Sequence, residues 1–450
     1  MGLYPIKPAL YICCFHLVFV YLPIKQLENY PDAAMIKHFI ILFCISVSIA
    51  SCKKVSVPAD SESSSIIIFG GGLSLEVKDM EATADGGFIF SGNSVTGPST
   101  GDLAFLLKTD ANGKQQWVRR FGGIKNNGFL KARQTSDGGY IAVGYTCSYG
   151  NGPKDGDYYP DGWMLKTDLN GNMQWQKIYG DIYFDSLSDI KEMPDHGFVS
   201  VGGFTVMNPY YVSYERQFYM MRTDQAGNIK WENAYMNTIY RSSGQSVDIS
   251  PNGDIIASGL AVKSNLEIDQ GTYFPCIIRA NATTGLQKGT NLIYNGFGNC
   301  GLTRITSVAD GYVLAADNIA DSTYTPTLIK NDFLLNFKWQ KQYSPGFVIA
   351  NLSKSMNGGF NLSGTFGGIA SKCALLDVDA GGNLFSTIEF GSSDLNKDKF
   401  NPSQPSTINI LPTGNGYAVG AALSSSSVNS SKIFALFFSD QNGKITDHGK

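Results

Sequence analysis

The sequence is poor in charge and in histidine, and both shortages limit what the protein can do. Only 16% of its 450 residues are charged, and the formal net charge is −3. Such a chain has no basic face to attract nucleic acid, so we expect no nucleic-acid partner. Only His196 and His448 lie in the part expected to fold, which argues against a histidine-rich metal site or a Ser-His-Asp triad.

Local catalytic motifs are also scarce, since the chain has no HExxH or P-loop pattern. The cysteines beyond the N-terminal hydrophobic region show no CxxC spacing, which argues against zinc or a redox dithiol: Cys147, Cys276, Cys300 and Cys373. We expect Cys276 and Cys300 to be either buried thiols or a disulfide. A carboxylate pair acting on glycosides leaves no local motif, so that chemistry stays open.

Glycine is abundant, at 50 residues, and it recurs inside an internal repeat. A unit begins at a turn such as Asp85-Gly86-Gly87 and ends at a segment such as Trp117 to Gly123. Its second turn, Asp110-Ala-Asn-Gly113, is again rich in the residues that tight hairpins need. Each unit therefore predicts a four-stranded antiparallel meander. Seven units start at Asp85, Asp137, Asp195, Asn252, Asp310, Asn357 and Asn415.

Seven such sheets, stacked face to face and closed, predict an all-β fold, a seven-bladed β-propeller over residues 66–450. A solenoid is the structural alternative. The segment Ile66 to Gly71 matches the end of a fourth strand without its three partners, whereas the last unit lacks most of its fourth strand. We therefore expect the N-terminal strand to complete the last blade. The repeated tryptophans are expected in the core between blades: Trp117, Trp175, Trp231 and Trp339.

The first 65 residues are predicted to direct and anchor the chain. Residues 35–51 have the basic start and short apolar stretch of a secretory signal. Its end, Ile49-Ala-Ser-Cys52, resembles the lipobox of bacterial lipoproteins, which implies acylation of Cys52 and a lipid anchor, expected at the outer membrane of a diderm bacterium. An ordinary cleaved signal or an uncleaved membrane anchor is the alternative. Residues 1–34 fit a misassigned start, and residues 52–65 a flexible tether.

The repeats resemble the SBBP-type β-propeller repeats of secreted and lipid-anchored bacterial proteins, through units of the form DGGY…D-x-x-G-x-x-W-x-x-x-F/Y-G-G. The resemblance covers about residues 66–443. It implies the propeller fold and carries over no catalytic residues.

An up-and-down meander places the A–B and C–D turns on one rim, the turn rim, and the B–C loops and D–A crossings on the other, the loop rim. The turn rim reads as Asp/Asn/Gly turns throughout, whereas the loop rim carries long segments with aromatic residues suited to a glycan or protein ligand. Candidate ligand-binding residues are Tyr158, Tyr159, Tyr210, Tyr211 and Tyr214, unless they only pack their own loops. His196 is expected to be an exposed turn residue.

Calcium is the one cofactor considered, through Asp155, Asp157 and Asp161, with a solvated acidic loop as the alternative. Otherwise we expect no cofactor. The sequence thus favours a monomeric, non-enzymatic binding or scaffolding lipoprotein of the cell envelope, with the membrane reached only through its lipid anchor. The alternative is a polysaccharide-acting enzyme, a glycosidase or lyase, that uses carboxylates in the propeller funnel.

Overall fold

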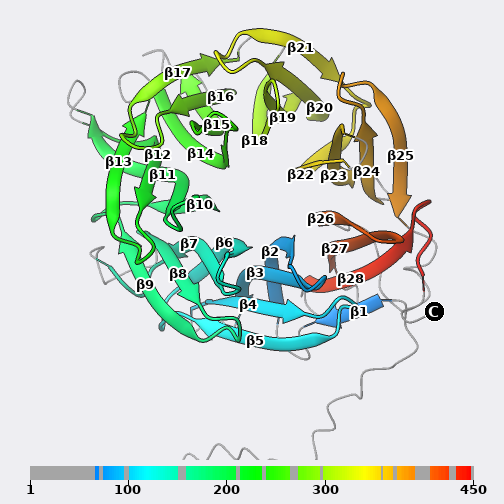
Figure 1. The fold of residues 1–450 in the computed structure, drawn as a ribbon, viewed down its shortest axis with the longest axis horizontal. Helices are drawn as coiled ribbons and strands as arrows, with labels where there is room; N and C mark the ends of the chain where they lie inside the picture. Colours follow the sequence, from blue (N-terminus) through cyan, green and yellow to red (C-terminus); the bar gives the residue numbers. More distant parts are fainter. Residues whose placement is uncertain are drawn as a thin grey trace, which may run out of the picture. The chain divides into compact units, whose positions relative to one another are not determined.

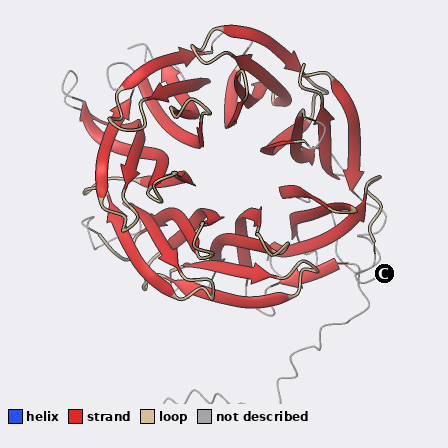
Figure 2. Ribbon diagram, in the orientation of Figure 1, coloured by secondary structure: helices blue, strands red, loops and turns tan. Residues whose placement is uncertain are grey.

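The computed structural model confirms the seven-bladed β-propeller: seven four-stranded antiparallel sheets form a ring (Figures 1 and 2). It describes residues 66–69, 74–95, 101–150, 159–208, 213–235, 240–263, 272–293, 297–355, 358–367, 372–390, 406–424 and 432–446. Chain contacts separate Met1–Ser61 from Glu62–Lys450, and all described residues belong to the second unit. Within these ranges no helix is long and apolar enough to cross a membrane.

The blades follow the predicted repeats, and each runs from an inner strand A to an outer strand D. Blade 1 consists of β2 (Ser74–Ala82), β3 (Phe88–Val95), β4 (Leu103–Thr109) and β5 (Gln115–Phe121), and blade 2 of β6 (Asn127–Gln134), β7 (Tyr140–Thr146), β8 (Asp161–Thr167) and β9 (Met173–Tyr179). Blade 3 consists of β10 (Ser186–Glu192), β11 (Phe198–Asn208), β12 (Ser213–Thr223) and β13 (Ile229–Tyr235), and blade 4 of β14 (Tyr240–Ile249), β15 (Ile255–Lys263), β16 (Tyr273–Ala280) and β17 (Gln287–Leu292).

Blades 5 to 7 complete the ring. Blade 5 consists of β18 (Asn299–Val308), β19 (Gly311–Ala320), β20 (Thr323–Asn331) and β21 (Phe337–Gln342), and blade 6 of β22 (Phe347–Lys354), β23 (Phe360–Phe366), β24 (Lys372–Val378) and β25 (Leu384–Phe390). Blade 7 consists of β26 (Ser406–Thr413), β27 (Gly416–Ser424), β28 (Lys432–Asp440) and the N-terminal strand β1 (Ile66–Phe69).

The N-terminal strand closes the ring, as the sequence predicts. β1 pairs antiparallel with β28, with Ile66 opposite Phe437 and Phe69 opposite Phe434. The buried Phe69 ring lies 5.4 Å from the Phe434 ring and 5.8 Å from that of Phe90 in blade 1. Beyond the last C–D turn, Ile445 bridges Ser439. The outer strand of blade 7 is thus assembled from both ends of the described chain.

Repeated aspartates and lysines hold the two hairpins of a blade together in blades 1, 2 and 5. In blade 1, Lys108 Nζ on strand C lies 2.7 Å from Asp85 Oδ2 in the A–B turn. Lys166 and Asp137 repeat this pair at 2.8 Å in blade 2. The C–D turn aspartate caps its own turn, because Asp168 Oδ1 accepts the backbone N–H groups of both Asn170 and Asn172. These residue types therefore recur because the turns require them.

The strand-D tryptophans lie between blades, as expected. Trp117 packs against Tyr140 of the next blade, with ring centroids 5.5 Å apart. It also lies under Gly171 of that blade's C–D turn, where φ is +76° and an added Cβ would meet the indole at 2.8 Å. Glycine is therefore needed for both backbone conformation and space.

Candidate functional site

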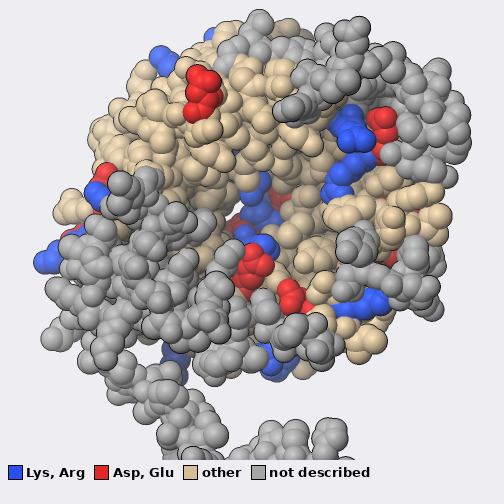
Figure 3. Space-filling view, turned by 180° about the vertical axis from the view of Figure 1, so that it is seen from behind, with Lys and Arg blue, Asp and Glu red and all other residues tan. Residues whose placement is uncertain are grey.

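A β-bulge at the same place in every inner strand directs polar side chains into the central channel. Each inner strand shows a register shift against its B strand at this position, as between Val77 and Asp79 in blade 1. Bulges re-aim side chains in this way. The residues at the equivalent position of the seven inner strands are Asp79, Lys131, Asp189, Ser246, Arg304, Asn351 and Asn409. They directly follow the bulge in every blade except the fifth, where the shift lies between Cys300 and Thr303 and Arg304 comes one residue later. Figure 3, seen from behind, shows a central hollow with acidic and basic side chains inside it.

Most charged side chains of this channel ring are paired. Lys131 Nζ lies 2.6 Å from Asp79 Oδ1, and both side chains are almost fully buried. Arg133 pairs with Glu81 and also reaches Asp189 Oδ1 at 3.1 Å. The ring therefore holds buried charges that satisfy one another, which is the condition for keeping charges out of water.

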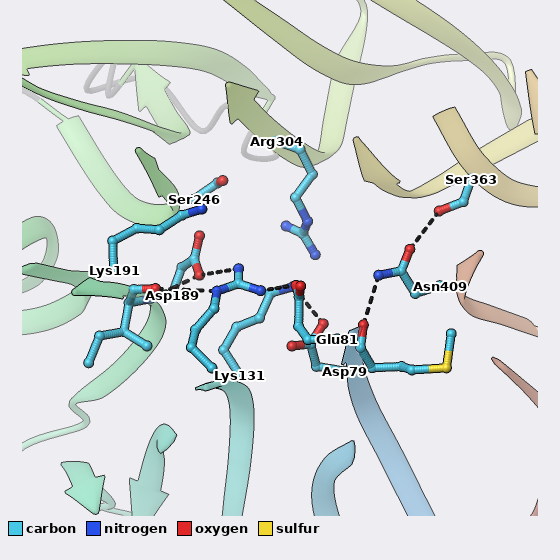
Figure 4. Close-up of polar contacts among 12 residues, drawn as sticks. Asp79, Glu81, Lys131, Asp189, Lys191, Ser246, Arg304, Ser363 and Asn409 are labelled. Atoms are coloured by element: carbon cyan, nitrogen blue, oxygen red, sulfur yellow. Dashed lines mark hydrogen bonds and ion pairs between the residues drawn. The ribbon is translucent and has the colours of Figure 1, made fainter. Parts of the chain in front are cut away.

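Polar links on or beside the inner strands cross all seven blade interfaces, and Figure 4 shows some of them, including Lys131–Asp79 and Ser363–Asn409. They run from one blade to the next through Lys131–Asp79, Arg133–Asp189, Val247 N–Asp189 (3.0 Å), Ser307 N–Asp248 (2.8 Å), Ile349 N–Asp317 (3.0 Å), Ser363–Asn409 (3.3 Å) and Asn409 Nδ2–Met80 O (2.8 Å). The described channel carboxylates thus hold blades together. This role argues against their use as free catalytic groups.

Arg304 is the exception among the charged groups of the ring. Figure 4 shows its side chain pointing into the channel. Nη1 donates to the carbonyl of Thr303 at 3.0 Å, whereas Nε is buried and has no hydrogen-bond partner among the described residues. Burial lowers the pKa of the guanidinium, and the carboxylates of Asp189 and Asp79 oppose that shift. The Nε–H of Arg304 is therefore a buried donor without a described partner.

Asp317, which links blades 5 and 6, gives a testable pH dependence. Burial raises the pKa of its carboxyl from 3.8 to about 7, against the opposing Ile349 N–H bond and Arg304. As pH rises, the carboxyl ionises at a lower pH in the unfolded chain than in the folded protein. Its contribution to the free energy of unfolding is therefore largest below about pH 4 and falls as pH rises toward 7. We expect Asp317→Asn, which keeps the acceptor for Ile349, to flatten this fall by a few kcal/mol, since one pKa unit is about 1.4 kcal/mol. Urea unfolding from pH 4 to 8 measures it, and an unchanged slope would contradict the assignment.

The loop rim carries four exposed aromatic side chains over blades 2 to 4, which together with Arg216 we call the rim aromatic patch: Tyr149, Tyr159, Phe184 and Tyr273. The guanidinium of Arg216 lies 4.7 Å from the centroid of the Phe184 ring. Its Nη2 donates to Ser186 Oγ at 2.7 Å. The residue after Tyr159, Pro160, accepts the Asp185 N–H at 2.7 Å, which ties the Tyr159 segment to Phe184.

Two buried carboxylates lie beneath this patch. Asp161 Oδ1 and Asp185 Oδ2 both approach Gly180, at 2.7 and 2.4 Å from the position an added Cβ would take. Burial raises the pKa of Asp185 to about 7; N–H bonds from Thr205 and Asp181 oppose the shift, and the Asp181 and Asp161 carboxylates add to it. Asp185 is thus held partly protonated near neutral pH, beneath the exposed aromatic side chains.

The sequence candidates fall unevenly on the described chain. Tyr159 is exposed on the loop rim, and Tyr214 pairs with Met207 near the start of β12. Cys52, Tyr158, Tyr210, Tyr211, Asp155 and Asp157 lie outside the described residues. Asp161 is buried at the start of β8, so a solvated loop does not describe it. No group of three or more potential metal ligands occurs within the described ranges.

The remaining sequence expectations concern single residues. His196 is an exposed turn residue with φ of +59°, as expected. Cys276 and Cys300 are buried free thiols, so of the two alternatives the disulfide does not form. The turn rim is less polar than predicted, because Leu169, Leu286 and Leu334 are exposed on its C–D turns.

The channel ring was missed at the sequence level, although the sequence carries a signal for it. Each ring residue stands six positions before the Asp or Asn that starts the A–B turn, from Asp79 before Asp85 to Asn409 before Asn415. This spacing places polar side chains at the same height in all blades.

Comparisons with known proteins support the fold. No protein-family model and no curated protein matches the sequence. A solved polysaccharide lyase, an ulvan lyase bound to -[GlcA(1-4)Rha3S]-, is similar over 84% of this chain and 96% of its own, at 8% identity and a TM-score of 0.52. The β-propeller domain of the Trilobed protease from Pyrococcus furiosus covers 83% and 97%, at 9% identity and a TM-score of 0.45. At 8% identity the likeness to the ulvan lyase shows the fold alone.

Proposed function

We propose that the protein is a lipid-anchored envelope protein whose propeller acts as a non-enzymatic binding module for a glycan. The rim aromatic patch carries the proposal, because exposed aromatic rings on loops over a rigid scaffold provide large contact area at low entropic cost. Arg216 adds a hydrogen-bond donor beside Phe184. The lipobox at Cys52 and the resemblance to SBBP-type repeats support attachment to the outer membrane.

The glycan proposal predicts loss of binding when the exposed rings are removed. We expect the triple variant Tyr159→Ala, Phe184→Ala and Tyr273→Ala to lose at least about tenfold in affinity, since aromatic anchors carry much of the energy of an interface. Binding is measured on a glycan array and by co-sedimentation with insoluble envelope and plant polysaccharides. Melting temperature should change little, because these side chains are exposed.

The matched control removes two exposed aromatic rings from the opposite rim, Phe337→Ala and Phe385→Ala. This variant should bind like the parent. Equal losses in both variants would contradict a ligand site on the loop rim. Binding of an envelope protein but of no glycan would shift the ligand class to protein.

A polysaccharide-acting enzyme is the second candidate, and the raised pKa of Asp185 next to Asp161 favours it as a source of a general acid. Both carboxyls are almost fully buried, however, and need the covering segments to move before they touch a substrate. Release of reducing ends or unsaturated products from a polysaccharide by the parent, abolished by Asp185→Asn, would establish the enzyme.

A further inference from the structure

Exposed apolar side chains recur on the C–D hairpins of five consecutive blades, and we call them the hairpin apolar ring: Leu169, Met173, Ile229, Leu286, Leu334, Phe337, Leu384 and Phe385. Met173, Ile229, Phe337 and Leu384 open strand D in their blades. Leu334 is 72% exposed and Phe385 77%. Because they recur on equivalent hairpins of neighbouring blades, these side chains give one rim a series of exposed apolar groups suited to a broad, flat partner.

Polar groups of the same hairpins are already engaged, so the ring offers apolar contact above all. Asp332 accepts the N–H groups of Leu334 and Asn336 and pairs with Lys338 at 2.9 Å. Lys230 is likewise paired with Asp195 at 2.7 Å. The described lysines beside the ring therefore supply little free positive charge for anionic headgroups.

The chain enters the propeller on this same rim. β1 runs antiparallel to β28, and its first residue, Ile66, is opposite Phe437, close to the turn that follows Asp440. Strand D in blades 1 to 6 starts at the turn rim. In blade 7 Ile445 bridges Ser439 at that end, and β1 continues the outer strand from Ile66, opposite Phe437. Thirteen residues separate Cys52 from Ile66, a length that reaches at most about 50 Å when extended.

We propose that the turn rim lies against the lipid bilayer, with the hairpin apolar ring inserted between headgroups and the rim aromatic patch facing away. The inference rests on the proposed acylation of Cys52 and adds a second, apolar contact to that anchor, because acyl chains and apolar side chains act together in membrane attachment. The segment that leads from Cys52 to β1 and the hairpin apolar ring both lie toward the turn rim. The ligand-binding rim then points away from the membrane that holds the protein.

Depth-dependent fluorescence quenching tests this orientation. The reporter variant Phe385→Trp places an indole in the ring, and Phe184→Trp places one on the loop rim. The acylated full-length chain is reconstituted in vesicles of phosphatidylethanolamine and phosphatidylcholine with brominated acyl chains. After subtraction of the parent's quenching, the reporter at position 385 should be quenched at least twofold more than that at 184. Equal or reversed quenching would overturn the orientation.

A second measurement separates the surface from the anchor. With Cys52→Ala as background, vesicle binding should fall at least threefold further on adding Phe337→Ser, Leu384→Ser and Phe385→Ser, but not on adding Phe184→Ser and Tyr273→Ser. If the protein with Cys52 intact is not labelled by palmitate, the lipid-anchor proposal is wrong. If it is labelled but the two reporters are quenched equally, only the proposed orientation is wrong. If the serine substitutions instead convert a dimer to a monomer in sedimentation, the ring binds a second copy and the lipid proposal is wrong.

Discussion

Deletion of residues 53–69 should lower the melting temperature by about 10 °C or more, or cause aggregation, relative to a chain lacking only residues 53–65. The larger deletion removes β1, which exposes the edge of β28 and takes away the buried Phe69 between Phe434 and Phe90. Unpaired edges and open blade interfaces are the weak points of closed β arrays. Differential scanning calorimetry provides the measurement.

The shorter deletion is the matched control, because it removes the preceding segment and leaves β1 in place. It should melt like the parent. Indistinguishable melting of the two deletions would show that Ile445 and its neighbours close blade 7 without β1.

Lys131→Met should lower the free energy of unfolding by about 3–5 kcal/mol, the usual cost of breaking a buried ion pair from one side. The substitution leaves the Asp79 carboxylate buried without its partner, which lies 2.6 Å away in the parent. Asp79 Oδ2 already has no hydrogen-bond partner among the described residues, so no described donor is in place to compensate. Urea unfolding monitored by tryptophan fluorescence gives the free energy.

The double variant Lys131→Met with Asp79→Asn supplies the control, because it removes both charges. It should recover at least half of the loss, since a neutral amide is far cheaper to bury than a carboxylate. A single variant that loses less than about 1 kcal/mol would mean that water reaches the pair and screens it.

The fold could be predicted from the sequence because similar turn residues recur in seven successive units. Asp85-Gly86-Gly87 and Asp110 to Gly113 each demand a particular hairpin, and the strand bounds follow from them to within a few residues, as β4 at Leu103–Thr109 shows. The orphan segment at Ile66 predicted closure because its pattern matches only strand D.

The sites were harder to predict, since they depend on contacts between blades. Asp79 and Lys131 are neighbours only because two inner strands lie side by side with matching bulges. Likewise Phe184 and Arg216 meet across a D–A crossing and a strand C that differ in sequence from the other units. The repeated residues predict the scaffold, whereas the site residues lie where the units differ from one another. Which of these residues come together can therefore be seen only in the structure.

The pairing of β1 with β28 also determines when the propeller can close during synthesis. β1 is the first strand of the propeller to be made, yet its partner is the last, so the earliest strand has no hydrogen-bonding neighbour until nearly the whole chain has emerged. Contacts so distant along the chain are slow to form and leave apolar edges exposed meanwhile. A polypeptide of this design would therefore be exposed to aggregation between synthesis and closure, and truncated translation products would never complete the ring.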